Sequence, residues 1–441
     1  MVLPEKFSER TRQVLNDEYP AFEAALDTVS PTSIRINTKI ANISTDEKVS
    51  WCDSGCYLPE RPLFTADPLL HGGAYYVQEA SSMFLYQVVK QCFPDAERVL
   101  DLCAAPGGKS TLLSQTLSAD SLLVSNEIVR QRAQILAENI TKWGNKNVVV
   151  TNNKASDFAL LEHYFDAIVI DAPCSGEGMF RKDSNAINEW SVDNVMNCVS
   201  RQREILNDVW DALKPNGILV YSTCTYNREE NEENVAWICN ELGAERMKLN
   251  VENSDIVETD GGYRFYPHRV RGEGFFISVM RKNEENAHTS TFKNMLPKNA
   301  IKVESSMLSV QLMESENFLF YNFDNKISAF NKKYINELMY IRSKFNCFVV
   351  GIELFEVKGK DFIPSHQLAL SKLLDTNSCQ SIEVDYETAI AYLKREAVSL
   401  PEAPKGYLLI RYKSLALGWV KNIGNRCNNL YPQHWRIRMN L

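Results

Sequence analysis

The stretch Val99-Leu-Asp-Leu-Cys-Ala-Ala-Pro-Gly-Gly-Lys109 decides the fold, because it has the pattern of a buried strand that turns into a helix. Its glycines let the backbone approach a ligand closely, and the first turn of the helix presents free N–H groups to that ligand. The glycine spacing is not G-x-G-x-x-G, and no phosphate loop of the required lysine–serine form is present, so a dinucleotide or triphosphate site is not supported. The stretch predicts a strand–turn–helix unit with a ligand at the turn.

Further units of the same kind extend from about Tyr75 to Lys282. The expected strands are Arg98–Leu102, Leu122–Asn126, Asn147–Thr151, Ala167–Ile170, Ile218–Ser222 and Phe275–Met280. The expected helices are Lys109–Leu117, Arg130–Trp143, Val199–Leu213 and Glu230–Glu241. Short apolar strands that alternate with helices are typical of a parallel sheet covered on both faces. We therefore predict an α/β protein with a doubly wound, Rossmann-like domain, whose site lies at the carboxyl ends of the strands.

The chain of 441 residues is long enough for about three domains. In the N-terminal part, Phe7–Leu26 has the apolar spacing of a helix and Ser33–Ile40 alternates like a strand. The expected units are a small α/β N-terminal module (1–72), the central domain (73–282), a polar linker (283–304) and a C-terminal unit of mixed α and β structure (305–441).

The composition is typical of a soluble globular protein, which we expect in the cytoplasm. Apolar residues make up 44% and charged residues 24%, and no apolar run approaches the ~20 residues of a membrane-spanning helix. The first ten residues lack the order of a signal peptide. The 11 cysteines are therefore expected as reduced thiols. Only Cys52 and Cys56 lie close together, and no second pair completes a zinc site, so no metal is expected.

The net charge of −8 argues weakly against a nucleic-acid partner, but the charge is uneven along the chain. Lys405–Leu441 contains seven basic residues, no acid, and the aromatic residues Tyr407, Tyr412, Trp419, Tyr431 and Trp435. Such a stretch suits phosphate contacts and base stacking. It equally suits a small domain whose aromatic residues form its own core, and the stretch alone does not decide between these interpretations.

An acid follows the second expected strand of the central domain, at Glu127. A carboxylate at this place in a doubly wound fold accepts hydrogen bonds from ribose hydroxyls. Together with the turn at Gly107–Gly108, it indicates an adenosine-containing cofactor without demanding a triphosphate. A cofactor of the S-adenosyl-L-methionine kind is favoured over a nucleotide, and a glycine turn with only a packing role is the alternative.

Two cysteines follow the next pair of neighbouring strand ends. Cys174 lies in Asp171-Ala-Pro-Cys-Ser-Gly-Glu-Gly178, and Cys224 lies in Tyr221-Ser-Thr-Cys-Thr-Tyr226. A single cysteine is more often a buried, inert residue than a nucleophile. Two cysteines at neighbouring strand ends of a cofactor site reverse that expectation, because an ionised thiol is a strong nucleophile.

These segments together resemble the NOL1/NOP2/Sun family of RNA cytosine-5 methyltransferases. The resemblance spans the central domain through CAAPGGK at Cys103–Lys109, DAPCSGEGMFRKD at Asp171–Asp183 and STCTYNREENE at Ser222–Glu232. It continues in SIRINT at Ser33–Thr38, YYVQEASSM at Tyr75–Met83 and RFYPHRVRGEGFF at Arg264–Phe276. The segment Leu417–Arg436 is similar to the PUA-like C-terminal domain of the bacterial RsmF-like branch, which modifies small-subunit (16S) ribosomal RNA. The resemblance therefore implies RNA as the partner of the basic C-terminal stretch.

The resemblance also implies roles for four residues. Cys224 would attack carbon 6 of cytosine, which makes carbon 5 nucleophilic enough to take the methyl group. Cys174 would assist product release, Asp171 would hydrogen-bond the cytosine ring nitrogen, and Lys109 would support Asp171. By analogy with DNA cytosine methyltransferases, whose Pro-Cys cysteine is the nucleophile, Cys174 would attack instead, and this alternative stays open.

For S-adenosyl-L-methionine, the family pattern implies contacts from one loop and two acids. The implied cofactor residues are Cys103, Ala104, Ala105, Pro106, Gly107, Gly108, Lys109, Glu127 and Asp171. The pattern also has an acid near adenine, after the third strand, where this sequence reads Thr151-Asn-Asn-Lys154. Asn153 can supply one hydrogen bond there, whereas Asp157 comes later in the chain, so this contact departs from the family pattern.

Several further residues each have two interpretations. Met179, Phe180 and Arg181 are candidates to line the cytosine pocket. For Phe180, packing in the protein interior is the alternative. Gln78 and Ser82 touch RNA or cap a helix, and His268 positions RNA or is structural. The acidic run Glu229–Glu233 is expected as a solvated helix start that faces away from phosphate.

The leading hypothesis is an S-adenosyl-L-methionine-dependent RNA (cytosine-5-)-methyltransferase that acts on small-subunit ribosomal RNA or its assembly intermediate. A target cytosine must leave its stack to reach the thiols. The rival hypotheses are a non-catalytic RNA-binding ribosome-assembly factor on a methyltransferase scaffold, and a methyltransferase for a protein or small molecule. We expect a monomer, with no membrane and no DNA partner.

Overall fold

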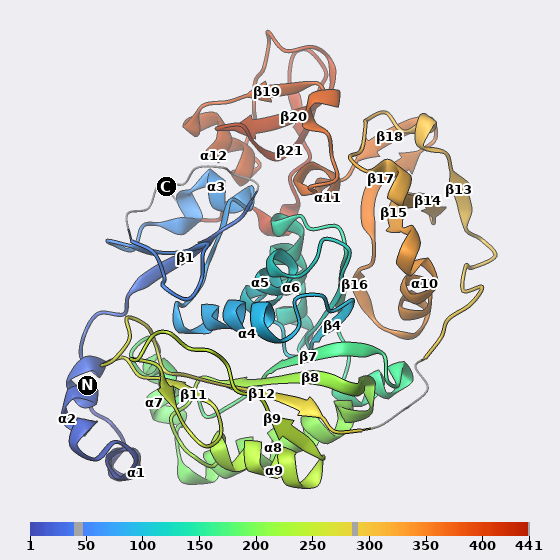
Figure 1. Cartoon of the computed structure of the whole chain (residues 1–441). Helices are drawn as coiled ribbons and strands as arrows, with labels where there is room; N and C mark the ends of the chain where they lie inside the picture. Colours follow the sequence, from blue (N-terminus) through green and yellow to red (C-terminus); the bar gives the residue numbers. More distant parts are fainter. Residues whose placement is uncertain (39–46, 285–289, 440–441) are drawn as a thin grey trace.

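The computed structural model describes residues 1–38, 47–284 and 290–439 (Figure 1). Within them, a ten-stranded sheet forms the centre, with the order β10-β11-β12-β8-β7-β4-β5-β6-β16 and with β9 paired to β12. Its strands are β4 (Arg98–Asp101), β5 (Leu122–Asn126), β6 (Val148–Thr151), β7 (Phe165–Asp171), β8 (Leu213–Thr223), β9 (Ala244–Arg246), β10 (Val257–Glu258), β11 (Tyr263–Phe265), β12 (Phe275–Lys282) and β16 (Cys347–Val349). Strands β6, β5, β4, β7 and β8 are parallel neighbours, and β12 runs antiparallel to β8. The expected doubly wound domain is confirmed.

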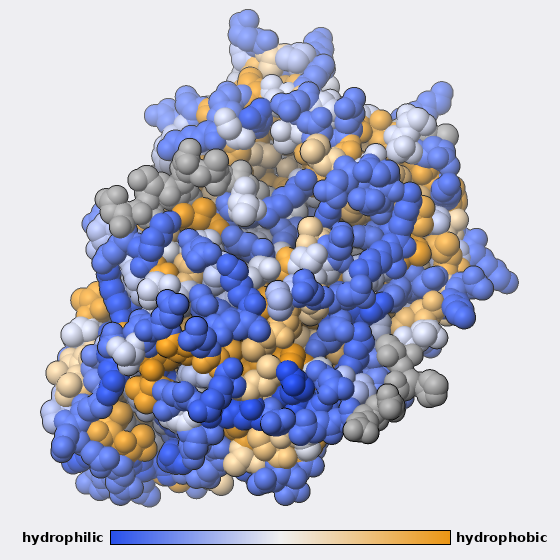
Figure 2. Space-filling model, viewed as in Figure 1, coloured by the Kyte–Doolittle hydropathy of each residue, from blue (hydrophilic) through white to orange (hydrophobic). Residues whose placement is uncertain are grey.

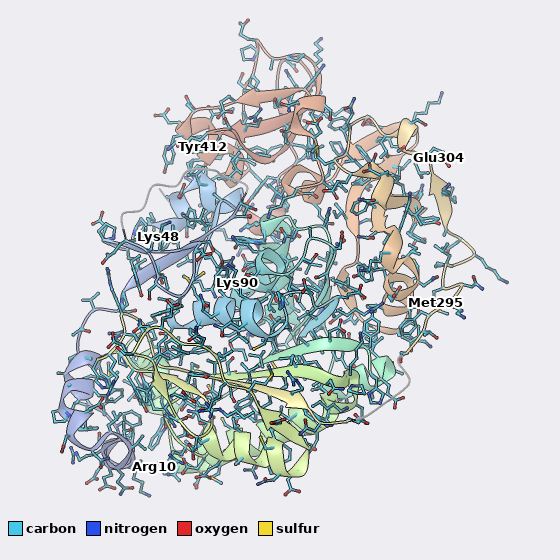
Figure 3. All side chains as sticks on the ribbon, in the orientation of Figure 1. Arg10, Lys48, Lys90, Met295, Glu304 and Tyr412 are labelled. Carbon is cyan, nitrogen blue, oxygen red and sulfur yellow. The ribbon has the colours of Figure 1, made fainter. Side chains whose placement is uncertain are left out.

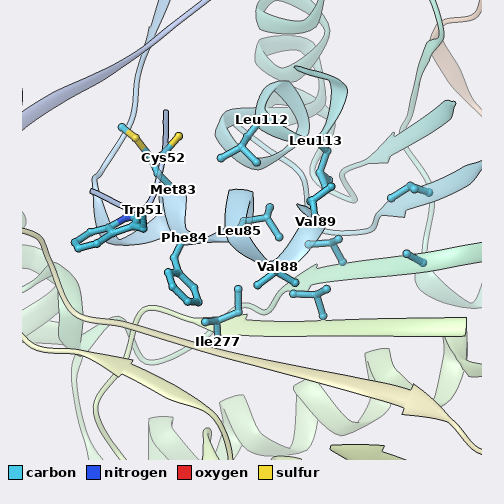
Figure 4. Close-up of a cluster of buried hydrophobic side chains, with 14 of the residues drawn as sticks. Trp51, Cys52, Met83, Phe84, Leu85, Val88, Val89, Leu112, Leu113 and Ile277 are labelled. Carbon is cyan, nitrogen blue, oxygen red and sulfur yellow. The ribbon is translucent and has the colours of Figure 1, made fainter. Parts of the chain in front are cut away.

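Helices cover both faces of this sheet because its strand residues alternate between two apolar clusters. On β4, Val99 joins one cluster and Leu100 joins the other. The first cluster includes residues of α4 (Leu85–Cys92), α5 (Gly108–Thr116) and α6 (Arg130–Trp143). The second includes residues of α8 (Val192–Val209), α9 (Glu232–Glu241) and α10 (Ile335–Lys344). Figure 4 shows the first cluster, where Leu85, Val88 and Val89 of α4 lie between Ile277 and the α5 side chains Leu112 and Leu113.

The helices of the central domain lie close to their expected places. Helix α8 begins earlier than expected because the Ser191 hydroxyl accepts a hydrogen bond from the Asn194 N–H at 3.0 Å and caps it. It ends at Val209, since Leu213 already begins β8. A short helix, α7 (Ser184–Glu189), precedes it.

The N-terminal part contains two helices where one was expected over 7–26. Helix α1 (Glu5–Leu15) and helix α2 (Tyr19–Leu26) are separated at Asn16, whose φ of 48° lies in the left-handed region that asparagine tolerates. A three-stranded antiparallel sheet follows, in the order β2-β1-β3, with β1 (Thr32–Ile36), β2 (Gly55–Leu58), β3 (Tyr75–Val77) and helix α3 (Pro68–His71). Strand β3 comes after the expected boundary at residue 72, and the end of the expected strand at 39–40 lies outside the described residues.

The C-terminal region beyond residue 300 contributes to three different sheets. A five-stranded sheet contains β13 (Ile301–Val303), β14 (Phe318–Phe323), β15 (Lys326–Asn331), β17 (Ile352–Lys358) and β18 (Asp361–Pro364). A four-stranded sheet contains β19 (Ser381–Glu383), β20 (Gly406–Tyr412), β21 (Leu415–Asn422) and β22 (Cys427–Asn429). Helices α11 (His366–Leu370) and α12 (Tyr386–Lys394) accompany them. Strand β16 instead pairs with β6 and extends the central sheet.

The face of the molecule seen in Figure 2 is mostly polar. In Figure 2, hydrophilic residues cover most of the visible face and apolar residues form small, separate patches. Among the helices of the described residues, none has both the length and the apolar character needed to cross a membrane.

Candidate active site

The candidate site lies at the carboxyl ends of β4, β7 and β8, which meet at one edge of the sheet because these strands are parallel. A cavity of about 340 Å³ opens there. Its lining includes expected site residues from all of the motifs: Cys103, Ala104, Ala105, Pro106, Gly108, Lys109, Asp171 and Cys224. The fold therefore brings together residues that are far apart in the sequence.

The two expected catalytic cysteines face each other. The Sγ atoms of Cys174 and Cys224 are 3.3 Å apart, and the structure records both cysteines as free thiols. The hydrogen bond to Cys224 and burial raise the pKa of Cys174 well above its usual value. A close backbone approach holds the two segments together, since the Gly178 N–H donates to the Cys224 carbonyl oxygen at 2.9 Å. A Cβ at Gly178 would lie 2.5 Å from the carbonyl oxygen of Gly274, so this approach requires glycine.

The second expected pair, Lys109 and Asp171, forms an ion pair at the cavity wall. The Lys109 Nζ lies 2.8 Å from Asp171 Oδ2, and the Ser222 hydroxyl donates to Asp171 Oδ1 at 2.9 Å. Burial lowers the pKa of Lys109, but the Asp171 carboxylate outweighs burial and the net pKa is raised. Lys109 therefore stays charged, and it holds the Asp171 side chain, which is 37% exposed and lines the cavity.

The loop at Cys103–Gly107 has a fixed path that suits a cofactor. The Ala104 N–H donates to the Asn126 carbonyl oxygen at 2.8 Å, and Arg132 of α6 donates to the Ala105 carbonyl oxygen at 2.8 Å. Gly107 caps α5 with a φ of 117°, a conformation that side chains rarely adopt. A Cβ at Gly108 would lie 3.4 Å from the Tyr76 ring, which is an ordinary van der Waals contact. These features fit a ligand held against the backbone.

Asp101, which ends the strand of the quoted motif, is a buried acid next to the site that the sequence reasoning missed, and it is not among the residues that line the cavity. It is buried, and its Oδ2 accepts a hydrogen bond from the Ser110 hydroxyl at 2.6 Å. Its Oδ1 has no hydrogen-bond partner in the described part of the chain. Burial raises the pKa of Asp101 to about 7. A buried acceptor without a partner beside the cofactor loop fits a ligand that donates a hydrogen bond.

Glu127 and Asn153 are not among the residues that line this cavity. Glu127 is buried, with Oε1 accepting from the Val129 N–H at 2.8 Å and Oε2 lying 3.3 Å from Arg132. Both side-chain groups of Asn153 are already hydrogen-bonded: Oδ1 accepts from the Asn346 N–H at 2.9 Å, and Nδ2 donates to Asp157 at 2.8 Å. Their contacts with a cofactor stay predictions.

The structure separates the lesser candidates. Met179 lines the cavity, whereas Phe180 is buried against Phe7 with ring centroids 5.0 Å apart. Gln78 and Ser82 also line the cavity, and Gln78 accepts a hydrogen bond from Arg35.

The prediction of a solvated acidic helix start at Glu229–Glu233 is wrong for two of its members. Glu230 is 0% exposed and Glu232 is 4% exposed. Glu232 is buried because it forms an ion pair with Arg264 at 2.5 Å, a partner supplied by the distant strand β11. Sequence spacing did not reveal this partner.

A basic groove of about 1030 Å³ adjoins the cavity, and Lys182 lines both. The N-terminal module and the segment before β12 form its walls. Its basic residues are Arg61, Arg181, Lys182, His268, Arg269 and Arg271. Five of these six lie beside acids: Arg181 and Lys182 beside Glu273, at 3.0 and 3.5 Å, His268 and Arg269 beside Glu18, and Arg271 beside Glu47. The RFYPHRVRGEGFF segment carried the signal for this groove, but its second wall is visible only in the fold.

Three family models match the chain. One described as 16S rRNA methyltransferase RsmB/F matches residues 92–281. The N-terminal domain of 16S rRNA methyltransferase RsmF matches 3–80, and the methyltransferase RsmF PUA domain matches 379–437.

Curated relatives match nearly the whole chain. Ribosomal RNA small subunit methyltransferase F of Aliivibrio fischeri (strain MJ11) is 31% identical, over 98% of this chain and 97% of its own. The protein of the same name from Escherichia coli O6:H1 (strain CFT073) is 29% identical, over 98% and 96%.

Solved structures match the central part. A methyltransferase homologue from Pyrococcus horikoshii is 28% identical with a TM-score of 0.55, over 63% of this chain and 95% of its own. The structure of NSun6 from Pyrococcus horikoshii with SFG shares the fold, with a TM-score of 0.55. It is 21% identical, over 64% of this chain and 99% of its own.

Proposed function

Because the chain belongs to the family of ribosomal RNA small subunit methyltransferase F, we propose that it methylates carbon 5 of a cytosine in small-subunit ribosomal RNA. The family predicted from the motifs is confirmed. The prediction of a methyltransferase that uses S-adenosyl-L-methionine is confirmed as well. The observation that carries the reaction is the 3.3 Å approach of Cys174 and Cys224 beside the Lys109–Asp171 ion pair. A scaffold without catalysis has no need for two facing thiols at a cofactor cavity.

The reaction needs covalent catalysis because carbon 5 of cytosine is a poor nucleophile. The Cys224 sulfur adds to carbon 6, and the electrons of the double bond make carbon 5 nucleophilic. The ring nitrogen of cytosine is an acceptor, so Asp171, held by Lys109 and Ser222, acts in its protonated form. Its O–H donates to the ring nitrogen and gives up the proton as negative charge develops there.

The second half of the reaction restores the ring. Bound S-adenosyl-L-methionine supplies the methyl group, and the residues of the loop at Cys103–Lys109 hold it against the cavity wall. A base then removes the carbon 5 proton, and the bond between carbon 6 and the Cys224 sulfur breaks. The ring nitrogen returns its proton to Asp171, and the aromatic ring is restored. Cys174 donates a proton to the leaving sulfur, which suits a thiol whose pKa is raised.

The basic groove supports a path for the RNA strand on either side of the flipped cytosine. Arg61, Lys182 and Arg271 lie along it, and Lys182 marks the point where it meets the cavity. Arginine and lysine contacts to phosphates position RNA without reading its sequence. We infer that the RNA backbone follows this groove, and that the C-terminal domain of the PUA type holds a more distant part of the RNA. The substrate is ribosomal RNA or an assembly intermediate, and the protein acts as a monomer in the cytoplasm.

The experiment that tests the reaction is covalent trapping with Cys174→Ala, expressed in cells and purified under denaturing conditions. Because this variant keeps the nucleophile and loses the group that assists release, RNA stays bound to Cys224. Sequencing of the trapped RNA identifies the cytosine.

The double variant Cys174→Ala/Cys224→Ala is the control and traps nothing. An adduct with Cys224→Ala and none with Cys174→Ala would exchange the roles of the two cysteines. The absence of RNA from both single variants would contradict covalent catalysis and favour the scaffold.

A further inference from the structure

Two buried carboxylates lie behind the cysteine pair, and the reaction described above does not use them. Glu177 is 2% exposed and Glu230 is 0% exposed. Glu177 belongs to the segment that follows Cys174, in the short helix η5 (Glu177–Met179), and Glu230 belongs to the segment that follows Cys224. Burial of an ionised carboxylate costs free energy unless hydrogen bonds compensate it, so the partners of these two groups indicate their purpose.

Glu177 binds the segment of the other cysteine. Its Oε2 accepts three hydrogen bonds from residues directly after Cys224: the Thr225 hydroxyl at 2.7 Å, the Tyr226 N–H at 2.8 Å and the Asn227 N–H at 2.9 Å. One carboxylate oxygen thereby fixes the backbone on which Cys224 stands.

Glu230 makes the opposite connection. Its Oε2 accepts from the Ser175 N–H, next to Cys174, at 3.0 Å and from the Gln202 side chain at 2.7 Å. The same amide nitrogen of Gln202 donates to the Pro173 carbonyl oxygen at 3.0 Å, so both neighbours of Cys174 are held.

Each cysteine segment therefore supplies the acid that holds the other. A direct hydrogen bond between the Ser175 and Thr225 hydroxyls, at 3.0 Å, and the bond from Gly178 to Cys224 close the same interface. We propose that Glu177 and Glu230 are positioning residues, which form a reciprocal brace that sets the separation of the two sulfurs. Building on the function proposed above, Glu177 aligns Cys224 for attack and Glu230 aligns Cys174 for release.

The first test measures the brace without any RNA. In the full-length protein, the oxidant diamide takes two electrons and two protons from neighbouring thiols and leaves a disulfide, and peptide mapping detects the Cys174–Cys224 link. We expect Glu177→Gln and Glu230→Gln to form this link at least tenfold more slowly than the unchanged protein, because an amide in place of the carboxylate opposes the N–H donors.

The second test separates the two acids in the reaction, with a small-subunit ribosomal RNA transcript or isolated small subunits and radiolabelled S-adenosyl-L-methionine. Glu177→Gln should slow formation of the covalent RNA adduct about tenfold or more. Glu230→Gln should form the adduct normally and accumulate it, because release fails. In both variants kcat should fall while KM for the cofactor stays within about twofold.

Glu229→Gln is the matched control, since Glu229 directly precedes Glu230 but its side chain pairs with Arg10 of α1, labelled in Figure 3, at 2.6 Å. It should behave like the unchanged protein in both tests. If the glutamine variants do not fold, Asn227→Ala replaces them, because its side-chain amide donates to Glu230 at 2.7 Å and to the Thr225 hydroxyl at 2.8 Å and so belongs to the same brace. The same slowing of the disulfide is expected. Unchanged disulfide rates would overturn the brace, and equal loss of adduct formation in both variants would overturn the division of roles. The disulfide result stands even if no RNA is methylated.

Discussion

One buried carboxyl group, Asp101, contributes to the pH dependence of this protein's stability. Its pKa is 3.8 in an unfolded chain, and burial at the end of β4 raises it to about 7. Between these two values the folded protein binds a proton at Asp101 that the unfolded chain has lost. The contribution of Asp101 to the free energy of unfolding therefore falls as pH rises from about 4 to 7 and does not change further above pH 7.

We predict that Asp101→Asn removes this slope, because the amide keeps an acceptor for Ser110 and carries no charge to bury. The difference between the two proteins should grow with pH, at about 1.4 kcal/mol for each pH unit inside the window. Urea unfolding at several pH values measures it. Asp95→Asn, an exposed position before β4, should keep the slope, and parallel curves for Asp101→Asn and the unchanged protein would contradict the raised pKa.

At the scale of elements, Arg35 of β1 joins the N-terminal sheet to the helix that carries the cofactor turn. Its guanidinium is fully buried and donates to Gln78 at 2.8 Å and to the Thr111 hydroxyl of α5 at 2.5 Å. It also lies over the Trp143 ring, 4.4 Å from the centroid. Burial lowers the pKa of Arg35 to about 10, so it remains charged at neutral pH.

We predict that Arg35→Met destabilises the protein by roughly 2–4 kcal/mol, because it leaves several buried acceptors without donors. The affinity for S-adenosyl-L-methionine should fall as well, since Gln78 lines the cavity and loses its partner. Chemical denaturation and calorimetric titration measure the two effects. The control is Arg12→Met. Arg12 is exposed and lies over the Tyr19 ring, 4.6 Å from the centroid. This variant should change neither the free energy of unfolding nor the free energy of cofactor binding by more than about 0.5 kcal/mol.

At the scale of the whole molecule, the region after residue 304 is part of the catalytic core. Strand β16 covers the edge of β6, and Asn346 bonds to both Asn152 and Asn153. Helix α10 contributes Leu338 and Ile341 to the apolar cluster beneath the central sheet. The last sheet reaches the N-terminal module, where the Leu415 side chain would lie 2.3 Å from a Cβ at Gly72.

We predict that a chain ending at residue 304 is much less stable than one ending at 378. The shorter chain loses β16 and exposes the apolar cluster that α10 covers, whereas the longer chain loses only the four-stranded sheet. Thermal unfolding and solubility should show a lower Tm and aggregation for 1–304. Equal Tm values would contradict the contribution of β16 and α10 to the core.

Much of the fold and part of the site follow from the sequence because they depend on neighbours along the chain. The strand at Val99, the glycine turn, and the strands that end at Asp171 and Thr223 follow from local apolar patterns, and parallel strands then place their ends at one edge. The thiols of Cys174 and Cys224 and the Lys109–Asp171 pair therefore meet as expected. The roles of these residues stay predictions until the trapping experiment.

The tertiary structure alone decided what depends on partners distant in the chain. Glu230 and Glu232 look solvated in the sequence, but Ser175, Gln202 and Arg264 compensate their burial. The edge strand β16 and the second wall of the basic groove likewise come from segments far from the surfaces that they complete. The physical reason is that local patterns specify which residues are apolar or can turn, whereas the burial of a charge depends on donors that only the folded chain brings near.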